Sequence, residues 1–353
     1  MCMKSSRSIL SMRTVCPRTG GFLVEVVPFE QYLLPALLAP VLLAWGANRF
    51  VDGASALSFN LGMSPLLIGV LVMGFGTSLP ELLVSLFSSV MGNSGLSLGN
   101  AYGSNIINVG LVLGLAAVLS PVIVQNHVVK RELPLLILAT ALTAFFAMDY
   151  ELSRIEGAIL LASFVILLVF LVRASARKPA EVDNPGLQKK IEDRAIPLRK
   201  SVGYLVVGLA AIAVCSAALV WSARGIVSNL GVSELVVGVI LLAIGTSLPE
   251  LVVIVVAAKR GEHELALGNV IGSNLFNTLA VVGTAGLIAP SVLDKELITR
   301  DLPVMFALTG VLVVMAYGWG RRTGVINKVE GGVLLAGVAV YVAYLVYSTP
   351  IFA

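Results

Sequence analysis

The sequence GTSLPEL occupies Gly76–Leu82 and occurs again, unchanged, at Gly245–Leu251. It places a proline and a carboxylate inside long apolar stretches, where both residue types are costly. Other matches keep the same offset of 169 residues and need no gap: Gly99-Asn100 with Gly268-Asn269, Gly103-Ser104-Asn105 with Gly272-Ser273-Asn274, Asn108 with Asn277, and Asn60-Leu61-Gly62 with Asn229-Leu230-Gly231. The chain is therefore an internal duplication, and the polar residues that its two copies share are the first candidates for function.

The amino-acid composition indicates whether the duplicated chain folds in water or in a membrane. Of the 353 residues, 58% are hydrophobic and only 12% are charged, and the mean hydropathy is +0.96. Soluble domains carry about 25% charged residues, so the composition excludes a disordered chain and indicates a membrane protein. We attribute the net charge of +4 to basic loops rather than to a nucleic-acid partner. Three cysteines and two histidines leave little material for a disulfide framework, a zinc site or a histidine-based triad.

Ten apolar stretches are candidates for membrane spans. They run over Leu33–Asn48, Ser64–Val90, Gly99–Leu119, Leu133–Met148, Ile155–Val172, Val202–Trp221, Leu235–Ala258, Leu265–Ala289, Pro303–Trp319 and Gly331–Tyr347. The longest polar segment, residues 173–200, contains eight Lys/Arg and four Asp/Glu and divides the spans into five and five. We therefore expect an N-terminal extension over 1–30, a five-helix repeat over 31–172, a linker over 173–200 and a second five-helix repeat over 201–353.

The distribution of basic residues predicts the orientation of these spans, because cytoplasmic loops of membrane proteins are rich in Lys and Arg. If the linker is cytoplasmic, the loops on its side hold fifteen Lys and Arg residues, against four in the loops on the opposite side. Ten spans then place both termini outside the cytoplasm. The basic residues of the segment 1–30 do not fit this pattern, and we leave that segment out of the fold.

The two copies are expected to cross the membrane in opposite directions, because an odd number of spans separates their equivalent positions. Inverted repeats are typical of transporters, in which they place a binding site near the bilayer midplane between interrupted helices. The predicted fold class is an all-α membrane protein with ten transmembrane helices in two inverted five-helix repeats. Interrupted helices are expected within residues 74–108 and 243–277.

Glu81 and Glu250 are the only two of the twenty acidic residues that we expect deep within an apolar span. Ionisable side chains at this depth are rare and usually functional. Each glutamate follows a proline, which lacks an N–H and clashes with the carbonyl four residues back. Pro80 is therefore expected to free the carbonyl of Gly76 and to disturb that of Thr77, and the second copy repeats this. Carbonyl oxygens beside a carboxylate are the ligands that a hard cation such as calcium prefers.

Hydroxyl and amide side chains recur at helical spacing around the two carboxylates. Thr77 and Glu81 are four residues apart and share a helix face, as do Ser104 and Asn108 on the next span. The second copy repeats this spacing with Thr246, Glu250, Ser273 and Asn277. Taken singly, the serines and asparagines are better explained by hydrogen bonds between helices, and the glycines near them by close helix packing. Their repetition in register with both glutamates favours a shared site of oxygen ligands, for which zinc and copper are poor candidates.

The paired GTSLPE and GNxxGSNxxN motifs resemble the α-repeats of the calcium/cation antiporter superfamily, in its sodium/calcium exchanger branch. The resemblance covers nearly the whole chain after residue 30. It implies an exchanger that moves sodium inward and calcium outward. It also implies that calcium is held by the carboxylates of Glu81 and Glu250 and by the backbone carbonyls of Thr77 and Thr246.

The same resemblance implies a sodium site that overlaps the calcium site. Its implied ligands include Ser78, Ser247, Ser104, Ser273, Asn108 and Asn277, with carbonyls one turn earlier at Gly74 and Ala243. Asn277 stands where potassium-dependent relatives carry Asp, which argues against potassium co-transport. Proton-coupled members of the superfamily carry GNAxE-like motifs in place of GTSLPE, so calcium/proton antiport is the alternative to sodium coupling.

Two other classes of protein use similar residues. A channel can have the same ligands, but it needs no counter-ion on the opposite side of the membrane. An intramembrane hydrolase needs a nucleophile with a base, paired aspartates or a metal-binding histidine motif, and the sequence places no His or Asp in the middle of a span. We expect a monomeric, prokaryotic plasma-membrane antiporter with no enzymatic activity and no cofactor, whose partners are calcium, sodium and the lipid bilayer.

Overall fold

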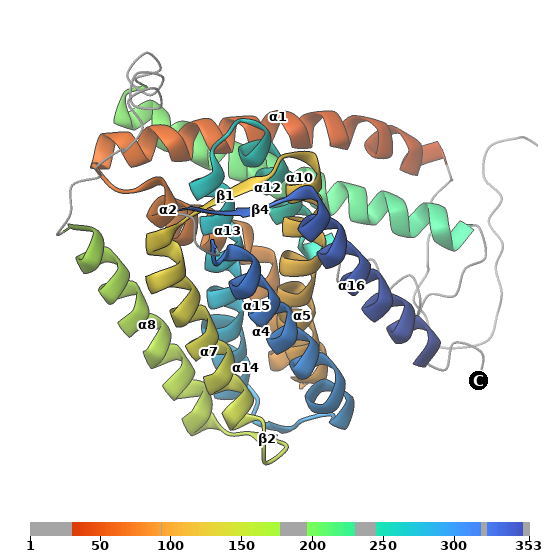
Figure 1. The fold of residues 1–353 in the computed structure, drawn as a ribbon. Helices are drawn as coiled ribbons and strands as arrows, with labels where there is room; N and C mark the ends of the chain where they lie inside the picture. The colour runs from red at the N-terminus through yellow and green to blue at the C-terminus, as the bar shows by residue number, and fades with distance from the viewer. Residues whose placement is uncertain (1–29, 93, 177–195, 230–244, 319–322, 349–353) are drawn as a thin grey trace, which may run out of the picture.

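The computed structural model describes residues 30–92, 94–176, 196–229, 245–318 and 323–348, which form a helical bundle (Figure 1). The helices of the first half are α1 (Glu30–Leu61), α2 (Pro65–Ile68), η1 (Gly69–Gly74), α3 (Phe75–Thr77), α4 (Leu79–Val90), α5 (Ser94–Ile107), η2 (Asn108–Leu113), α6 (Gly114–Leu119), η3 (Val128–Glu132), α7 (Leu133–Phe146) and α8 (Arg154–Ala176), where η denotes a π-helix. The second half contains α10 (Leu198–Asn229), α12 (Leu248–Lys259), α13 (His263–Leu275), η4 (Phe276–Val281), α14 (Val282–Ile288), η5 (Leu297–Asp301), α15 (Leu302–Ala316) and α16 (Lys328–Ser348).

The duplication in the sequence reappears as matched helices. At the offset of 169 residues, α1 corresponds to α10, α4 to α12, α5 to α13, and α7 to α15, with ends that agree within one residue. Even the short π-helices η3 and η5 correspond, and both lead into a helix with proline in its first turn. The same sequence pattern therefore forms the same local structure twice.

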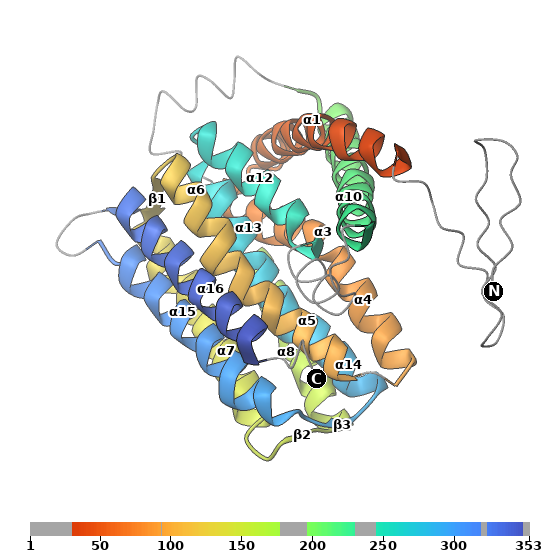
Figure 2. The same ribbon diagram turned by 90° about the vertical axis from the view of Figure 1, so that its right-hand side faces the viewer.

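Two antiparallel strand pairs show that the copies are inverted. β1 (Val122–Gln125) pairs with β4 (Thr323–Ile326), and β2 (Glu151–Leu152) pairs with β3 (Ser291–Val292). The repeat offset maps β1 onto β3 and brings β2 next to β4, so the two pairs are equivalent. They lie at opposite ends of the bundle (Figures 1 and 2), as an inverted repeat requires. The predicted helical membrane fold with inverted topology is confirmed.

Seven helices in the described part of the chain are long and apolar enough to cross a membrane, and the bent pair Pro65–Thr77 and Leu79–Val90 supplies an eighth span. The other two predicted spans are Leu133–Met148 and Leu235–Ala258. The first corresponds to α7, which has 14 residues and continues directly from η3. The second is described only from Gly245 onward. The count of ten transmembrane helices therefore stays a prediction.

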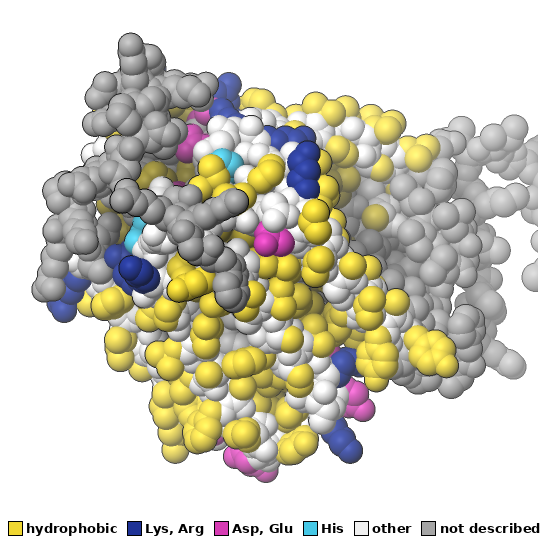
Figure 3. Space-filling view, in the orientation of Figure 1, with side chains coloured by type: hydrophobic (Ala, Val, Ile, Leu, Met, Phe, Trp, Pro, Cys, Tyr) yellow, Lys and Arg dark blue, Asp and Glu magenta, His cyan; other side chains and the backbone are white. Residues whose placement is uncertain are grey.

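The surface matches a lipid environment. Large apolar side chains are exposed along the outer helices, among them Leu138, Phe145, Ile166, Phe306, Val333 and Val340. On the face drawn in Figure 3, hydrophobic side chains cover much of the surface, and charged side chains gather in the upper part and along the lower edge. Exposed apolar area of this extent is unfavourable in water but suits contact with hydrocarbon.

The predicted interruption of the second span is present. α3 ends at Thr77, α4 begins at Leu79, and the segments on either side of Ser78 are bent by 44°. Proline is tolerated in the first turn of α4 because an N–H there has no partner within the helix. Ser247 precedes α12 with φ −88° and ψ 5°, nearly the values of Ser78, −87° and 9°. Both copies therefore break their helix one residue before the Leu-Pro-Glu sequence.

α13 lies at the centre of the bundle. The apolar stretch that runs through α13, η4 and α14 is completely buried, whereas only 22% of the corresponding stretches of α8 and α16 is buried. Gly268 and Gly272 allow this helix to touch the backbone of α2 and η1: a Cβ atom on Gly272 would lie 2.8 Å from the Cα atom of Val70. Close helix packing therefore explains these two glycines, whereas a Cβ atom on their counterparts Gly99 and Gly103 in α5 would meet no atom of the described residues within 4 Å.

Gly272→Ala should destabilise the protein by about 1–3 kcal/mol, the usual cost of overpacking a filled interior. The matched control is Gly332→Ala in α16, where a Cβ atom meets no atom of the described residues within 4 Å. The midpoint of thermal unfolding in detergent should fall for Gly272→Ala and stay near the wild-type value for Gly332→Ala. Equal midpoints for the two variants would contradict the close contact between α13 and η1.

Candidate cation-binding site

Glu81 and Glu250 occupy equivalent positions, each in the first turn of the helix that follows a break. Both side chains are completely buried, at 0% exposure. The first turn of a helix has free N–H groups and the positive end of the helix dipole, which favour a negative charge. The break that the prolines impose therefore places each carboxylate at a position where its charge is stabilised inside the membrane.

Hydrogen bonds join the two carboxylates to the opposite repeat and to the neighbouring helices. Ser78 of the first repeat donates through Oγ to Glu250 Oε1 of the second at 2.9 Å. Ser104 Oγ donates to Glu81 Oε1 at 3.3 Å and also lies 3.4 Å from Thr246 Oγ1 of the second repeat. Ser273 Oγ lies 3.4 Å from Glu250 Oε1. The structure thus brings together six side chains that the sequence singled out, namely the two glutamates, Thr246 and three serines.

Several oxygen atoms of the sequence-predicted ligand residues are buried without a hydrogen-bond partner in the described structure. They are Glu81 Oε2, Glu250 Oε2, Asn108 Oδ1, Asn277 Oδ1 and Ser247 Oγ. Leaving a polar atom buried and unpaired costs about 1–3 kcal/mol, and more for a charged group. The cost is offset if the oxygen atoms bind a cation. Calcium takes six to eight oxygen ligands, and carboxylate and amide oxygens are among those it prefers.

Asn108 and Asn277 are each located in a π-helix rather than in a continuous α-helix. Asn108 begins η2 and Asn277 is the second residue of η4. The wider turn of a π-helix is frequent at functional sites, because it changes the direction of side chains relative to the preceding α-helix. Asn108 Nδ2 donates to Asn274 Oδ1 at 3.3 Å, and this contact directs its amide across the interface between the repeats.

Asn100 and Asn269 are polar residues of the site region to which sequence reasoning gave no role. Thr77 Oγ1 donates to Asn269 Oδ1 at 3.1 Å, and Thr246 Oγ1 donates to Asn100 Oδ1 at 3.5 Å. Asn100 also donates through Nδ2 to the backbone carbonyl of Glu81 at 3.3 Å. Each repeat therefore braces the threonine of the other. Their repetition as Gly99-Asn100 and Gly268-Asn269 was the available signal, although spacing along one helix does not reveal a partner on another.

Backbone carbonyls just before the first break accept hydrogen bonds from side chains. Thr77 Oγ1 lies 3.0 Å from the carbonyl of Met73, and the carbonyl of Gly74 accepts a hydrogen bond from Ser273 Oγ at 3.1 Å. Gly74 therefore lies beside the carboxylate cluster, while Ala243 lies outside the described residues. The ligand roles of the carbonyls of Thr77 and Thr246 stay predictions.

Two further acidic residues are buried, although the sequence did not place them deep in a span. Glu132 and Asp301 are 1% and 7% exposed, and they are equivalent in the two repeats. Each pairs with the arginine that precedes it, Arg131 or Arg300. Asp301 also accepts a hydrogen bond from the hydroxyl of Tyr341 at 2.9 Å. A neighbouring cation therefore compensates each of these carboxylates, in contrast to Glu81 and Glu250.

Comparison with known proteins gives a consistent result over nearly the whole chain. A family model described as sodium/calcium exchanger protein matches residues 32–173 and 200–349. CaxA of Alkalimonas amylolytica is 42% identical over 315 residues, which cover 89% of this chain and 98% of that protein. The sodium/calcium exchanger MaX1 of Methanosarcina acetivorans is 33% identical over 347 residues, covering 88% and 96% of the two chains. The structure of the sodium-calcium exchanger NCX_Mj aligns with a TM-score of 0.77 at 32% identity, covering 90% and 99%.

Replacing either buried carboxylate by its amide should remove cation binding. Glu81→Gln and Glu250→Gln keep the side-chain volume but remove the charge that offsets the desolvation of a divalent ion. A ligand present at 100 times its Kd stabilises the folded state by about 2.7 kcal/mol, and both variants should lose this calcium-dependent rise in the unfolding temperature. Glu151→Gln, which changes an exposed carboxylate of β2, should keep it. A full calcium-dependent rise in either buried variant would exclude this site.

Proposed function

Because this chain belongs to the sodium/calcium exchanger family, we propose that it extrudes calcium across the membrane in exchange for sodium. The observation that carries the proposal is the pair of wholly buried carboxylates whose second oxygen atoms have no partner among the described residues. Two carboxylate charges balance one calcium ion or two sodium ions. The same oxygen atoms can therefore hold either ion in turn, and competition between the ions couples their movements.

The proposed ligand set follows from the resemblance and from the contacts around the glutamates. Glu81 and Glu250, with the backbone carbonyls of Thr77 and Thr246, hold calcium. The hydroxyl and amide oxygens of Ser78, Ser247, Ser104, Ser273, Asn108 and Asn277 hold sodium, with the glutamates shared. Sodium and calcium are both hard cations that favour such oxygens, whereas thiolate and imidazole ligands, which favour softer metals, are not part of the set.

Calcium/proton exchange is the second candidate. Two buried glutamates without a lysine or arginine partner in the described structure could carry protons instead of sodium ions. Sodium is the better choice because the set contains four serines and two asparagines, whose neutral oxygens bind a monovalent cation but carry no proton at neutral pH. The neutral amide of Asn277 also adds no charge for a further cation such as potassium.

The protein is a multi-pass membrane protein, and we place it in the plasma membrane with the linker 173–200 in the cytoplasm and both termini outside. Residues 177–195 of this linker, and residues 1–29, lie outside the described part of the chain. We further propose that the exchanger works as a monomer, without a cofactor and without enzymatic activity.

Calcium uptake into reconstituted vesicles should follow a sodium gradient in the complete absence of potassium. The reason is that the proposed set provides two carboxylates and neutral oxygens for sodium, and no third carboxylate for potassium. Flux of radioactive calcium is measured with sodium, potassium and pH gradients imposed separately. Loss of sodium-driven flux without potassium, or equal flux driven by a pH gradient alone, would contradict sodium coupling.

A cysteine at Ser175, where α8 ends, should be inaccessible from outside intact cells, because the excess of basic residues places this end in the cytoplasm. The experiment uses a chain from which Cys2, Cys16 and Cys215 have been removed and an impermeant maleimide as the reagent. A cysteine at Glu151, in the strand pair at the other end of the bundle, is the matched control and should react readily. Reaction at position 175 in intact cells would reverse the proposed orientation.

A further inference from the structure

Helices α1 and α10 form a closely packed pair that crosses the other helices (Figures 1 and 2). Glycines permit the close approach. A Cβ atom on Gly208 would lie 2.6 Å from the amide nitrogen of Phe50, and one on Gly53 would lie 2.7 Å from that of Leu205. Backbones in such contact cannot slide independently, because interiors packed at this density do not deform continuously. The two helices are therefore expected to move as one unit.

This helix pair lies directly over both helix breaks. A Cβ atom on Gly76, at the first break, would contact Leu209 of α10 at 3.5 Å and Phe50 of α1 at 3.7 Å. A Cβ atom on Gly245, at the second break, would meet Val220 of α10 at 2.6 Å. Because the breaks carry the residues next to the two glutamates, any movement of the pair changes what covers the carboxylate cluster.

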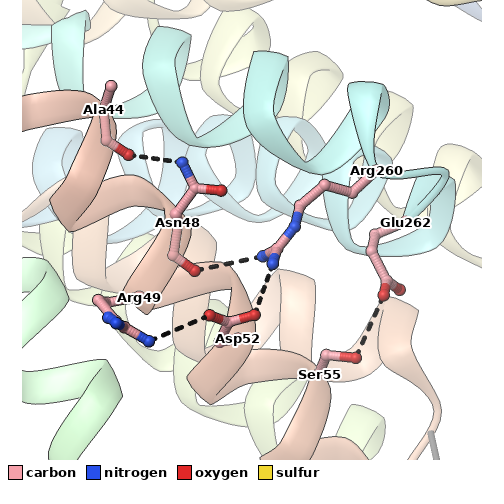
Figure 4. Close-up of polar contacts among 7 residues, drawn as sticks. All are labelled: Ala44, Asn48, Arg49, Asp52, Ser55, Arg260 and Glu262. Carbon is pink, nitrogen blue, oxygen red and sulfur yellow. Dashed lines mark hydrogen bonds and ion pairs between the residues drawn. The ribbon is translucent and has the colours of Figure 1, made fainter. Parts of the chain in front are cut away.

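One end of α1 is fastened to the turn between α12 and α13 (Figure 4). Arg260 binds Asp52 Oδ1 through NH2 at 2.6 Å and donates through NH1 to the carbonyl of Asn48 at 3.3 Å. Ser55 Oγ donates to Glu262 Oε1 at 3.3 Å. The three residues of α1 are spaced by four and three positions and so lie on one face of the helix. We call these contacts the α1 clamp.

The inverted repeat allows the α1 clamp to be compared with the equivalent position at the other end of the molecule. The offset of 169 residues maps Asp52 onto Trp221 of α10, and it maps Arg260 onto Met91 after α4. Neither residue is charged, and Met91 is 82% exposed. The Asp52–Arg260 ion pair therefore has no counterpart at these two positions, even though the helices around them are equivalent. The clamp is not a requirement of the fold, because the other copy folds without its two central charges.

We propose that the α1 clamp closes the cation site at the Arg260 face and biases the exchanger toward the conformation open at the opposite face. The proposal rests on the proposed exchange function, because only a protein with two access states has an equilibrium to bias. Arg260 follows Glu250 by ten residues, or about 15 Å along a helix, so the clamp joins α1 to the end of the helix that carries the second glutamate. With the linker in the cytoplasm, the favoured conformation is open to the outside.

The clamp is suited to bias the equilibrium without blocking it. The side chains of Asp52 and Arg260 remain 22% and 28% exposed, so water competes for the ion pair whenever it opens. Partly exposed ion pairs change an equilibrium by about two- to fivefold. A bias of this size leaves both access states populated during transport, and an internally symmetric protein without the clamp would have no such preference for one face.

The test compares Asp52→Asn and Arg260→Gln with the wild type in vesicles of known orientation. Each variant should raise the apparent calcium affinity at the Arg260 face by about two- to fivefold, because that affinity scales with the fraction of protein open there. Affinity at the opposite face should change little. Lys259→Gln removes the neighbouring charge but leaves the clamp contacts, and it should behave like the wild type. Asp52 also pairs with Arg49, whose NH1 lies 3.8 Å from Asp52 Oδ2. The charge exchange Asp52→Arg with Arg260→Asp is therefore made together with Arg49→Gln and should restore the wild-type values.

A second measurement reads the conformation without relying on transport. Spin labels at the exposed positions Leu61 on α1 and Val329 on α16 report the distance between the helix pair and the bundle. Asp52→Asn should increase the population of a second distance about two- to fivefold, and the charge exchange should reverse this increase. Unchanged distances together with unchanged affinities would overturn the clamp. Absence of sodium-driven exchange in the wild type, with the distances shifting as expected, would instead refute the proposed function.

Discussion

The burial of two carboxylates inside a membrane protein is the constraint on which the remaining structure depends. Ionised groups in this environment are costly unless they are paired, and Glu81 and Glu250 have no exposed surface. The helix breaks reduce this cost, since they place each carboxylate at a helix N-terminus. Hydroxyl donors satisfy one oxygen of each carboxylate, and the second oxygen has no partner in the described structure. We therefore expect a bound cation to balance the charge of the two carboxylates.

The inverted repeat provides this arrangement, because each copy completes the surroundings of the other. Ser78 of the first copy donates to Glu250 of the second, and Thr77 is braced by Asn269 from the opposite repeat. Neither repeat contains these contacts alone. A site formed between two inverted units can be exposed to either face by a movement of one group of helices against the rest. The α1–α10 pair, which contacts both breaks, is the group whose movement the proposed α1 clamp would bias.

The features that could be predicted from the sequence are those that recur along the chain, in the two copies of the repeat. The duplicated Gly76–Leu82 segment indicated the inverted fold and the proline breaks, and it singled out residues that the structure brings together. The π-helix that contains Asn277 was not predictable, because a π-turn arises from tertiary packing and has no distinct periodicity. The brace between Thr77 and Asn269 was missed because spacing along one helix does not specify which helices meet. Glu132 was missed because a residue at the edge of an apolar span has no clear signal of depth.

In the proposed exchange, calcium and sodium share one set of oxygen ligands between the repeats. The most direct test of this sharing is the binding of radioactive calcium to the purified protein as sodium replaces choline at constant ionic strength. The apparent Kd for calcium should rise steeply, with at least the second power of the sodium concentration, because at least two sodium ions replace one calcium ion in a shared site. The number of calcium sites should stay constant. A calcium Kd that does not change with sodium, or a loss of sites at unchanged Kd, would contradict a shared site.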